Sequence, residues 1–277
     1  MSISPHAKAA AWTAKWLTQE LKTFAKAGNW EGALSTFRQL EQATVVNRNV
    51  FHYTTVISAC CRAGQLKAAT QLLQEMKSNN VKPNVYTYTA LINGCAKEEN
   101  VDRALRIFAE MRLADVPPNV RTMTALITVC SRAGRWEKSF QVLKQCDEML
   151  IAPNVLTYTA AMDGCRRAGV CKPAVELLEK EMRSPLKVRP NHVTYNTVLG
   201  ACAAAKDMDA LLRVYAQMVS DGYQPVAYTK EVLTTAFQGT DLEGEADNLP
   251  VRHKLTRAEL YQPDCDPVTA MRATATD

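Results

Sequence analysis

The chain has 277 residues, 47% of them hydrophobic and 22% charged, with a formal net charge of +5 at pH 7. No apolar run approaches the roughly 20 residues that a helix needs to span a bilayer, so we expect no membrane role. The positive charge is concentrated in residues 1–238, which hold 29 basic and 20 acidic residues. This excess favours a polyanionic partner, although many proteins have a similar balance.

The first thirteen residues contain Lys8 and no acidic residue. A lack of acids is typical of organelle transit peptides, but this segment is short and has no arginine. We interpret residues 1–13 as a separate N-terminal segment with a transit-like composition.

The rest of the chain is dominated by a repeat. The stretch NVYTYTALINGCAK, which begins at Asn84, returns in related form from Asn49, Asn119, Asn154 and Asn191, at intervals of 35, 35, 35 and 37 residues. A period of this length predicts a solenoid of stacked supersecondary units, each burying its apolar face against its neighbours. The expected array covers residues 14–237, with repeats at 14–49, 50–84, 85–119, 120–154, 155–191 and 192–226 and a partial repeat at 227–237 that closes the last apolar face.

Each repeat shows two helical patterns. In the third repeat Tyr88, Leu91, Ile92 and Cys95 recur at helical spacing, and the residues from Ala104 to Met111 do so again after a break. Glycines follow the first helix in four repeats, where a left-handed residue ends a helix, and prolines close the exit loops of the five repeats from 50–84 to 192–226. Two surplus residues in repeat 155–191 predict a longer second helix or exit loop there.

After the array, residues 238–277 are acidic and contain three prolines. We predict that this tail is mostly disordered, with room for one short helix around Leu255–Tyr261.

Neither the cysteines nor the histidines indicate catalysis or metal binding. Five of the nine cysteines recur at one repeat phase, which is typical of small buried residues, and no C-x-x-C pair or zinc-ligand spacing is present. The four histidines are isolated, and no metalloprotease, phosphate-loop or serine-hydrolase motif occurs. We therefore expect no enzyme activity, no metal and no cofactor.

The 35-residue period, Tyr followed by Thr or Asn early in the first helix, Ala-Gly at the turn and a closing Pro-Asn together resemble the pentatricopeptide repeat family. The resemblance covers about residues 14–237. It implies an all-α fold, a right-handed α-solenoid superhelix of helix-turn-helix repeats. It also implies binding of single-stranded RNA at one base per repeat.

In the family the fifth and last residues of a repeat select the base. Carried onto this chain, the pairs are Thr54 with Asn84, Thr89 with Asn119, Thr124 with Asn154, Thr159 with Asn191, and Asn196 with Val226. The family pattern assigns adenine to Thr with Asn, which predicts four consecutive adenines. The last pair departs from the pattern, because the Val226 side chain cannot hydrogen bond and Asn196 would select alone.

Two further phases carry roles in the family. The second residues, which sandwich the base, are Phe51, Tyr86, Arg121, Leu156 and Val193. The thirteenth residues, which lie near the RNA backbone, are Lys26, Arg62, Lys97, Arg132 and Arg167. Aromatic and guanidinium planes stack on any base, and cations at repeat spacing suit a phosphate chain.

Structural explanations compete with each of these roles. The asparagines stand where a helix N-cap belongs, and the cations stand where a helix C-terminus favours positive charge. The concave face of a helical solenoid can also bind a peptide in a protein scaffold. We favour an RNA-binding protein of organellar RNA metabolism, in the mitochondrion or plastid, with other RNA-processing factors as further partners. The alternative is a helical-repeat scaffold for protein–protein interaction, and the sequence leaves the oligomeric state open.

Overall fold

The computed structural model describes residues 5–42, 48–182 and 188–239, and these residues form helices and the turns between them. The chain divides into two compact units, Met1–Val129 and Cys130–Asp277, with the boundary inside one helix. The predicted tail, including the helix around Leu255–Tyr261, lies outside the described residues.

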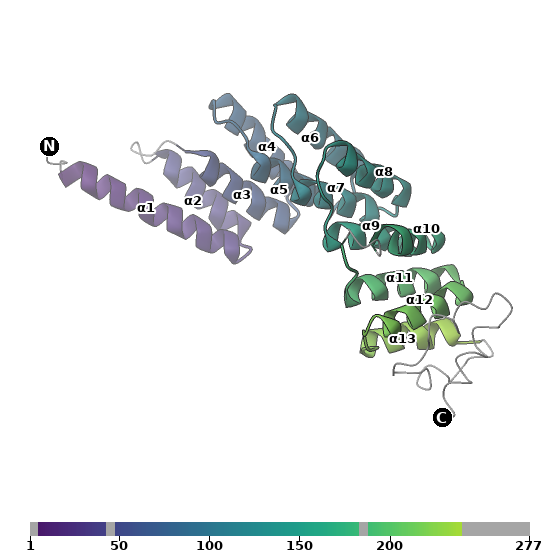
Figure 1. The fold of residues 1–277 in the computed structure, drawn as a ribbon. Coiled ribbons are helices and arrows are strands. Elements are labelled where there is room, and N and C mark those ends of the chain that lie inside the picture. Colours follow the sequence, from purple (N-terminus) through teal and green to yellow (C-terminus); the bar gives the residue numbers. More distant parts are fainter. Residues whose placement is uncertain (1–4, 43–47, 183–187, 240–277) are drawn as a thin grey trace. The chain divides into compact units, whose positions relative to one another are not determined.

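Every repeat contributes a pair of helices (Figure 1). The first helices are α1 (Pro5–Lys26), α3 (Val50–Ala63), α5 (Val85–Cys95), α7 (Val120–Arg132), α9 (Val155–Ala168) and α11 (His192–Ala205). The second helices are α2 (Trp30–Gln42), α4 (Leu66–Ser78), α6 (Val101–Leu113), α8 (Trp136–Glu148), α10 (Lys172–Glu176) and α12 (Met208–Ser220), and the half repeat supplies α13 (Ala227–Phe237). The predicted all-α repeat fold is confirmed.

Two helices differ from the sequence expectation. Helix α1 begins at Pro5, so part of the predicted N-terminal segment is continuous with the first helix of the array. In the fifth repeat α10 runs into a π-helical stretch, η1 (Leu177–Met182). A π turn widens the helix by one residue, which is one way to accommodate an insertion. The rest of the predicted insertion falls largely on residues 183–187, outside the described part of the chain.

First helices of successive repeats pack on one another within each unit. In the N-terminal unit α3 lies against α1 and α5, and in the C-terminal unit α11 lies against α9 and α13. Gly94 allows the α3–α5 contact, because a Cβ built on it would lie 2.8 Å from Sγ of Cys61. The turn after α3 needs a left-handed residue, and Gly64 supplies it with φ 81°.

The recurrent tyrosines and cysteines form the core between helices, as the pattern predicted. Tyr53, Tyr88, Tyr195 and five equivalent cysteines, Cys60, Cys95, Cys130, Cys165 and Cys202, are fully buried. Burial raises the pKa of these thiols to about 11 or 12, which keeps them protonated and unreactive at neutral pH.

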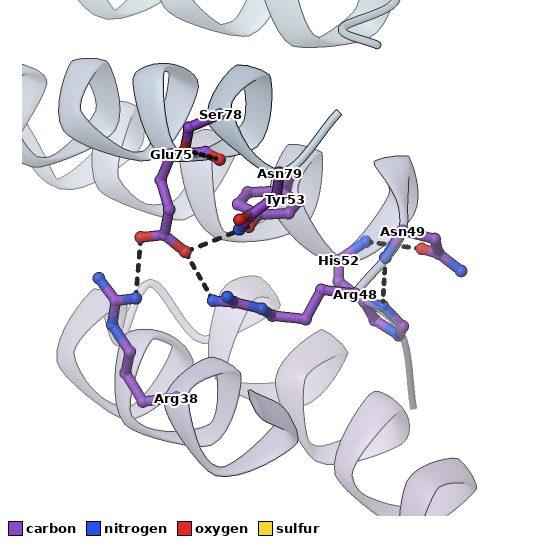
Figure 2. Close-up of polar contacts among 8 residues, drawn as sticks. All are labelled: Arg38, Arg48, Asn49, His52, Tyr53, Glu75, Ser78 and Asn79. Carbon is purple, nitrogen blue, oxygen red and sulfur yellow. Dashed lines mark hydrogen bonds and ion pairs between the residues drawn. The ribbon is translucent and has the colours of Figure 1, made fainter. Parts of the chain in front are cut away.

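In two repeats the hydroxyl of the buried tyrosine donates to a carboxylate on the second helix of the same repeat. Tyr53 Oη donates to Glu75 Oε1 over 3.1 Å, and Arg38 and Arg48 pair with the two Glu75 oxygens at 2.8 and 2.6 Å (Figure 2). The equivalent Tyr88 donates to Glu110 over 3.4 Å. These contacts connect α3 with α4 and α5 with α6.

Candidate nucleic-acid interface

The five recurrent asparagines are helix N-caps. In each, Oδ1 accepts a hydrogen bond of 2.9–3.2 Å from the backbone N–H three residues later. Four of these bonds come from threonines, Thr87, Thr122, Thr157 and Thr194. The fifth comes from His52, whose ring returns a contact to the backbone of Asn49 (Figure 2). The capping interpretation of the asparagines is thus confirmed, and it leaves the carboxamide nitrogen available for another role.

A buried threonine joins the two residues of a selecting pair at three places in the chain. Thr87 Oγ1 lies 2.8 Å from Thr54 Oγ1 and 3.1 Å from Asn84 Oδ1. Thr54 and Asn84 are themselves partly exposed, whereas Thr87 is fully buried. The structure therefore brings the predicted selectors of the second repeat to one place, although they are 30 positions apart in the sequence.

Two further pairs repeat this arrangement. In the N-terminal unit Thr122 Oγ1 lies 2.8 Å from Thr89 and 3.2 Å from Asn119. In the C-terminal unit Thr194 Oγ1 lies 2.9 Å from Thr159 and 3.0 Å from Asn191. We use the word joint for the place where the selector of one repeat, the last residue of that repeat and the third residue of the next repeat meet. The three joints have equal geometry because the same residue types occupy these three positions.

The remaining Thr–Asn pair, the third along the chain, has one member in each compact unit. Thr124 is partly exposed, and its hydroxyl donates to the Val120 carbonyl over 2.7 Å. Asn154 is exposed and caps α9 through Thr157.

The last predicted selector is placed differently. Asn196 is only 7% exposed. Its Oδ1 accepts from Thr229 Oγ1 over 2.7 Å, and its Nδ2 lies 3.2 Å from His192 Nδ1. Val226, its partner in the pair, makes no side-chain cap. This joint turns its polar side chain into the protein.

The predicted stacking residues share a solvent-facing position. Phe51, Tyr86, Leu156 and Val193 are 45–68% exposed, and Arg121 is exposed as well. Large apolar side chains at the surface of a folded chain often mark a binding site when they gather in one place. The half repeat continues the series with Tyr228, 47% exposed, which the sequence reasoning missed because it stopped assigning the phase at residue 226.

The predicted phosphate contacts are exposed cations, and three of them also have partners within the protein. Arg62 Nη2 donates to the Ala25 carbonyl over 2.6 Å, and Lys97 Nζ donates to the Arg62 carbonyl. Both carbonyls lie near the end of the preceding first helix, so these cations complement a neighbouring helix terminus. Arg167 instead pairs with the Asp163 carboxylate at 2.9 Å. The remaining two, Lys26 and Arg132, are exposed.

The carboxyl group of Asp163 has a shifted pKa. Its partial burial acts to raise the pKa, but hydrogen bonds from Arg167 and Arg166 outweigh burial and lower it. Asp163 is therefore ionised at neutral pH and offsets part of the positive charge at this position.

In the N-terminal unit a pocket of about 760 Å³ gathers all three classes of predicted site residue. Phe51 and Tyr86 line it together with Thr54, Asn84 and the cations Lys26 and Arg62. Lys22 lines it too, with Nζ 4.9 Å from the centre of the Phe51 ring. Sequence reasoning missed Lys22, because it lies one helical turn before Lys26 and outside the phases that carry family roles.

The described residues show neither a metal-binding cluster nor a membrane-spanning helix. They contain no group of three or more histidines, cysteines or carboxylates placed to hold a metal ion. Among them, too, no helix is long and apolar enough to cross a membrane.

Several solved protein structures superpose on this fold. The crystal structure of the pentatricopeptide repeat protein PPR10 from maize is 24% identical and superposes with a TM-score of 0.63, over 85% of this chain and 41% of that one. The pentatricopeptide repeat domain of Arabidopsis thaliana protein-only RNase P 1, solved in complex with tRNA, is 23% identical with a TM-score of 0.53, over 66% of this chain and 95% of that one. Nuclear proteinaceous RNase P 2 from A. thaliana is 18% identical with a TM-score of 0.57, over 69% of this chain and 43% of that one.

At sequence identities below 25%, these superpositions show a shared fold. The chain spans less than half the length of the maize protein. No curated protein sequence matches it. Models of the pentatricopeptide repeat match residues 48–97, 88–132, 118–167 and 177–237, which together make up well over half of the sequence. The chain belongs to the pentatricopeptide repeat family.

Proposed function

We propose that this chain binds single-stranded RNA along its first helices, with one base at each joint between repeats. The observation that carries the proposal is the pocket of the N-terminal unit. There an exposed aromatic pair, a partly exposed Thr–Asn pair and cations line one space of about 760 Å³. A nucleotide consists of a flat apolar base with a polar edge and a phosphate, and this lining offers a matching partner for each part.

The base preference that we propose is adenine at four successive joints. The Thr hydroxyl oxygen accepts the N6 amino hydrogen of the base, and the Asn amide nitrogen donates to N1. Because Thr and Asn recur in four pairs, from Thr54 with Asn84 to Thr159 with Asn191, the same base is expected four times. The joint of Asn196 and Val226 contributes least, since Asn196 is buried and hydrogen bonded within the protein.

Affinity comes from two further sets of residues. The second residues, Phe51, Tyr86, Arg121, Leu156 and Val193, cover the faces of the bases without distinguishing them. The thirteenth residues, Lys26, Arg62, Lys97, Arg132 and Arg167, contact the phosphates. The tRNA complex of a protein with the same fold supports RNA as the class of ligand.

At the level of the cell, we propose a role in mitochondrial or plastid RNA metabolism, through stability, processing or translation of a transcript. Any effect on RNA would come from occupancy, by shielding a segment, opening a hairpin or docking another processing factor. No catalytic step is proposed for this chain.

A binding experiment tests this function. Labelled single-stranded RNAs that differ only in a core of A4, C4, G4 or U4 are titrated with the protein at several salt concentrations. We expect the A4 RNA to bind most tightly, and all affinities to fall as salt rises. Equal affinity for the four cores contradicts the adenine preference. Absence of binding to any of them at moderate salt contradicts RNA binding and favours a protein-interaction scaffold.

A further inference from the structure

The buried threonine of each joint occupies a position that the selecting pair alone does not explain. Thr87, Thr122 and Thr194 are each the third residue of a repeat, fully buried, and within 2.8–3.2 Å of both members of a selecting pair. A base could not contact these hydroxyls directly, since they lie beneath the pair. They can act on a base only through the residues that they touch.

The hydrogen bonds of this threonine have a fixed direction. The backbone N–H of Thr87 can only donate, so the Asn84 atom 3.1 Å from it is an acceptor, the carboxamide oxygen. Thr87 Oγ1 donates a second hydrogen bond to that same oxygen, over 3.1 Å. Because the Thr87 hydroxyl has only one hydrogen, Thr54 is the donor in the 2.8 Å contact between the two threonines.

This direction leaves the selecting pair with one pattern of donors and acceptors. Both lone pairs of Asn84 Oδ1 accept bonds from Thr87, so only its amide N–H groups remain for a ligand. The Thr54 hydroxyl donates its hydrogen bond to Thr87, so it can only accept a hydrogen bond from a ligand. The same reasoning holds for the joints at Thr122 and Thr194, where the corresponding distances agree within 0.2 Å.

A free hydroxyl would not discriminate in this way. By rotating its proton it accepts from the N6 amino group of adenine or donates to the O6 carbonyl of a keto purine with equal ease. We propose that Thr87, Thr122 and Thr194 are specificity-determining positioning residues, which hold the selector hydroxyl as an acceptor and so exclude keto bases. This inference rests on the proposed function, because it assumes that a base lies against the pair.

The joint at His52 shows the opposite direction at the same phase. The backbone N–H of Asn49 lies 3.3 Å from His52 Nδ1, which must accept. Burial lowers the pKa of His52, so the ring is neutral and carries its hydrogen on Nε2, 3.1 Å from Thr18 Oγ1. Here the third residue donates the hydrogen bond to Thr18, the threonine of the first repeat that it contacts, so the direction of the bond follows the identity of the third residue.

Adenosine and inosine provide a matched pair of ligands for the test. They have the same purine shape, but inosine carries a carbonyl at position 6 and N–H at position 1, which reverses the pattern of donors and acceptors. RNAs with an A4 core are compared with RNAs that hold inosine at one of the four positions. For the wild-type protein we expect about tenfold weaker binding for each inosine opposite a Thr–Asn pair.

The variants are Thr87→Val, which removes the hydroxyl, and Thr87→Ser, which retains it. We expect Thr87→Val to reduce the preference for adenosine to below about threefold at the first position only, and Thr87→Ser to keep it near the wild-type value. Thr122→Val should act in the same way at the second position. The ratio of two affinities measured on one preparation does not depend on the folded fraction, so partial loss of stability leaves the result readable.

The possible outcomes separate the two proposals. If Thr87→Val weakens binding of both RNAs equally and keeps the ratio, the threonine only supports the helix cap and this inference is wrong. Wild-type protein that binds the A4 RNA and the inosine RNAs equally also contradicts it. Wild-type protein that binds none of the RNAs contradicts the proposed function itself, and the inference with it.

Discussion

The joint at Asn84 and the joint at Val226 share a buried threonine but use it in opposite ways. Thr87 donates a hydrogen bond to the side chain of Asn84, and the selector Thr54 is partly exposed and lines a pocket. The Val226 side chain cannot accept a hydrogen bond. Thr229 donates to Asn196 instead, and the Asn196 side chain is buried. The two joints thus differ both in the last residue of the repeat and in the exposure of the selector that it is paired with.

The largest difference between the two joints should appear in stability. Asn84→Ala removes a helix cap and the acceptor of a buried hydroxyl, and we expect a loss of about 1 to 3 kcal/mol in the free energy of unfolding. Val226→Ala removes no cap, and a change within about 0.5 kcal/mol is expected. Denaturant unfolding of both variants checks the contrast, and equal effects would show that the caps do not distinguish the joints.

A second contrast concerns how closely first helices approach. Gly94→Ala would place a Cβ 2.8 Å from the buried Cys61 sulfur, so we expect a loss of about 1 to 2 kcal/mol. In the matched control, Gly200→Ala, the new Cβ meets Cδ of Arg166 at 2.9 Å, a flexible side chain that can move. Thermal unfolding should separate the two, and a Gly94 variant as stable as the control would contradict the close packing of α3 on α5.

The joint at Val226 lacks a side-chain helix cap, which a single substitution should supply. Val226→Asn should supply the missing cap of α13 and stabilise the protein by about 0.5 to 2 kcal/mol. The new side chain should also accept the hydrogen bond that Thr229 now donates to Asn196. Asn196 could then turn towards solvent and add a fifth base-selecting position. Unfolding measurements test the first effect, and binding to RNAs that vary the fifth base tests the second. An unchanged or lower unfolding free energy would mean that the joint lacks more than a cap.

The smallest expected effect concerns the cations. Lys97 donates to an uncharged carbonyl, whereas Arg167 is paired with the carboxylate of Asp163, which offsets its charge. Lys97→Gln should therefore reduce the slope of log affinity against log salt by about 1, and Arg167→Gln by less. Affinity measured across a salt series gives both slopes. A slope change for Arg167→Gln as large as that for Lys97→Gln would contradict the idea that Asp163 offsets the charge of Arg167 in the complex.

The sequence could predict the features that each repeat contains within itself. Tyr88 and Cys95 lie at helical spacing and are buried, Gly64 ends its helix in the left-handed conformation, and the helices follow the predicted order. These features depend on residues a few positions apart, where periodicity and capping rules apply directly.

The parts that sequence could not predict arise between repeats. A threonine at the third position recurs visibly, but its contact with Thr54 needs two first helices docked in a particular register. Lys97 reaches the Arg62 carbonyl for the same reason, and the burial of Asn196 depends on Thr229 in the next helix. Repeat phase identifies such residues, whereas only packing shows which partner each one takes.

The central claim is that a Thr–Asn pair reads one base through its pattern of donors and acceptors. The most direct test is the double variant Thr89→Asn with Asn119→Asp, measured against RNA cores A-A-A-A and A-U-A-A. The aspartate introduced at position 119 can still cap α7 and accept from Thr122, and its second oxygen would accept N3–H of uracil. The amide of the asparagine introduced at position 89 would donate to O4 of the same base. We predict that the wild-type protein prefers A-A-A-A and that the variant prefers A-U-A-A. A folded variant that retains the wild-type preference would contradict the account.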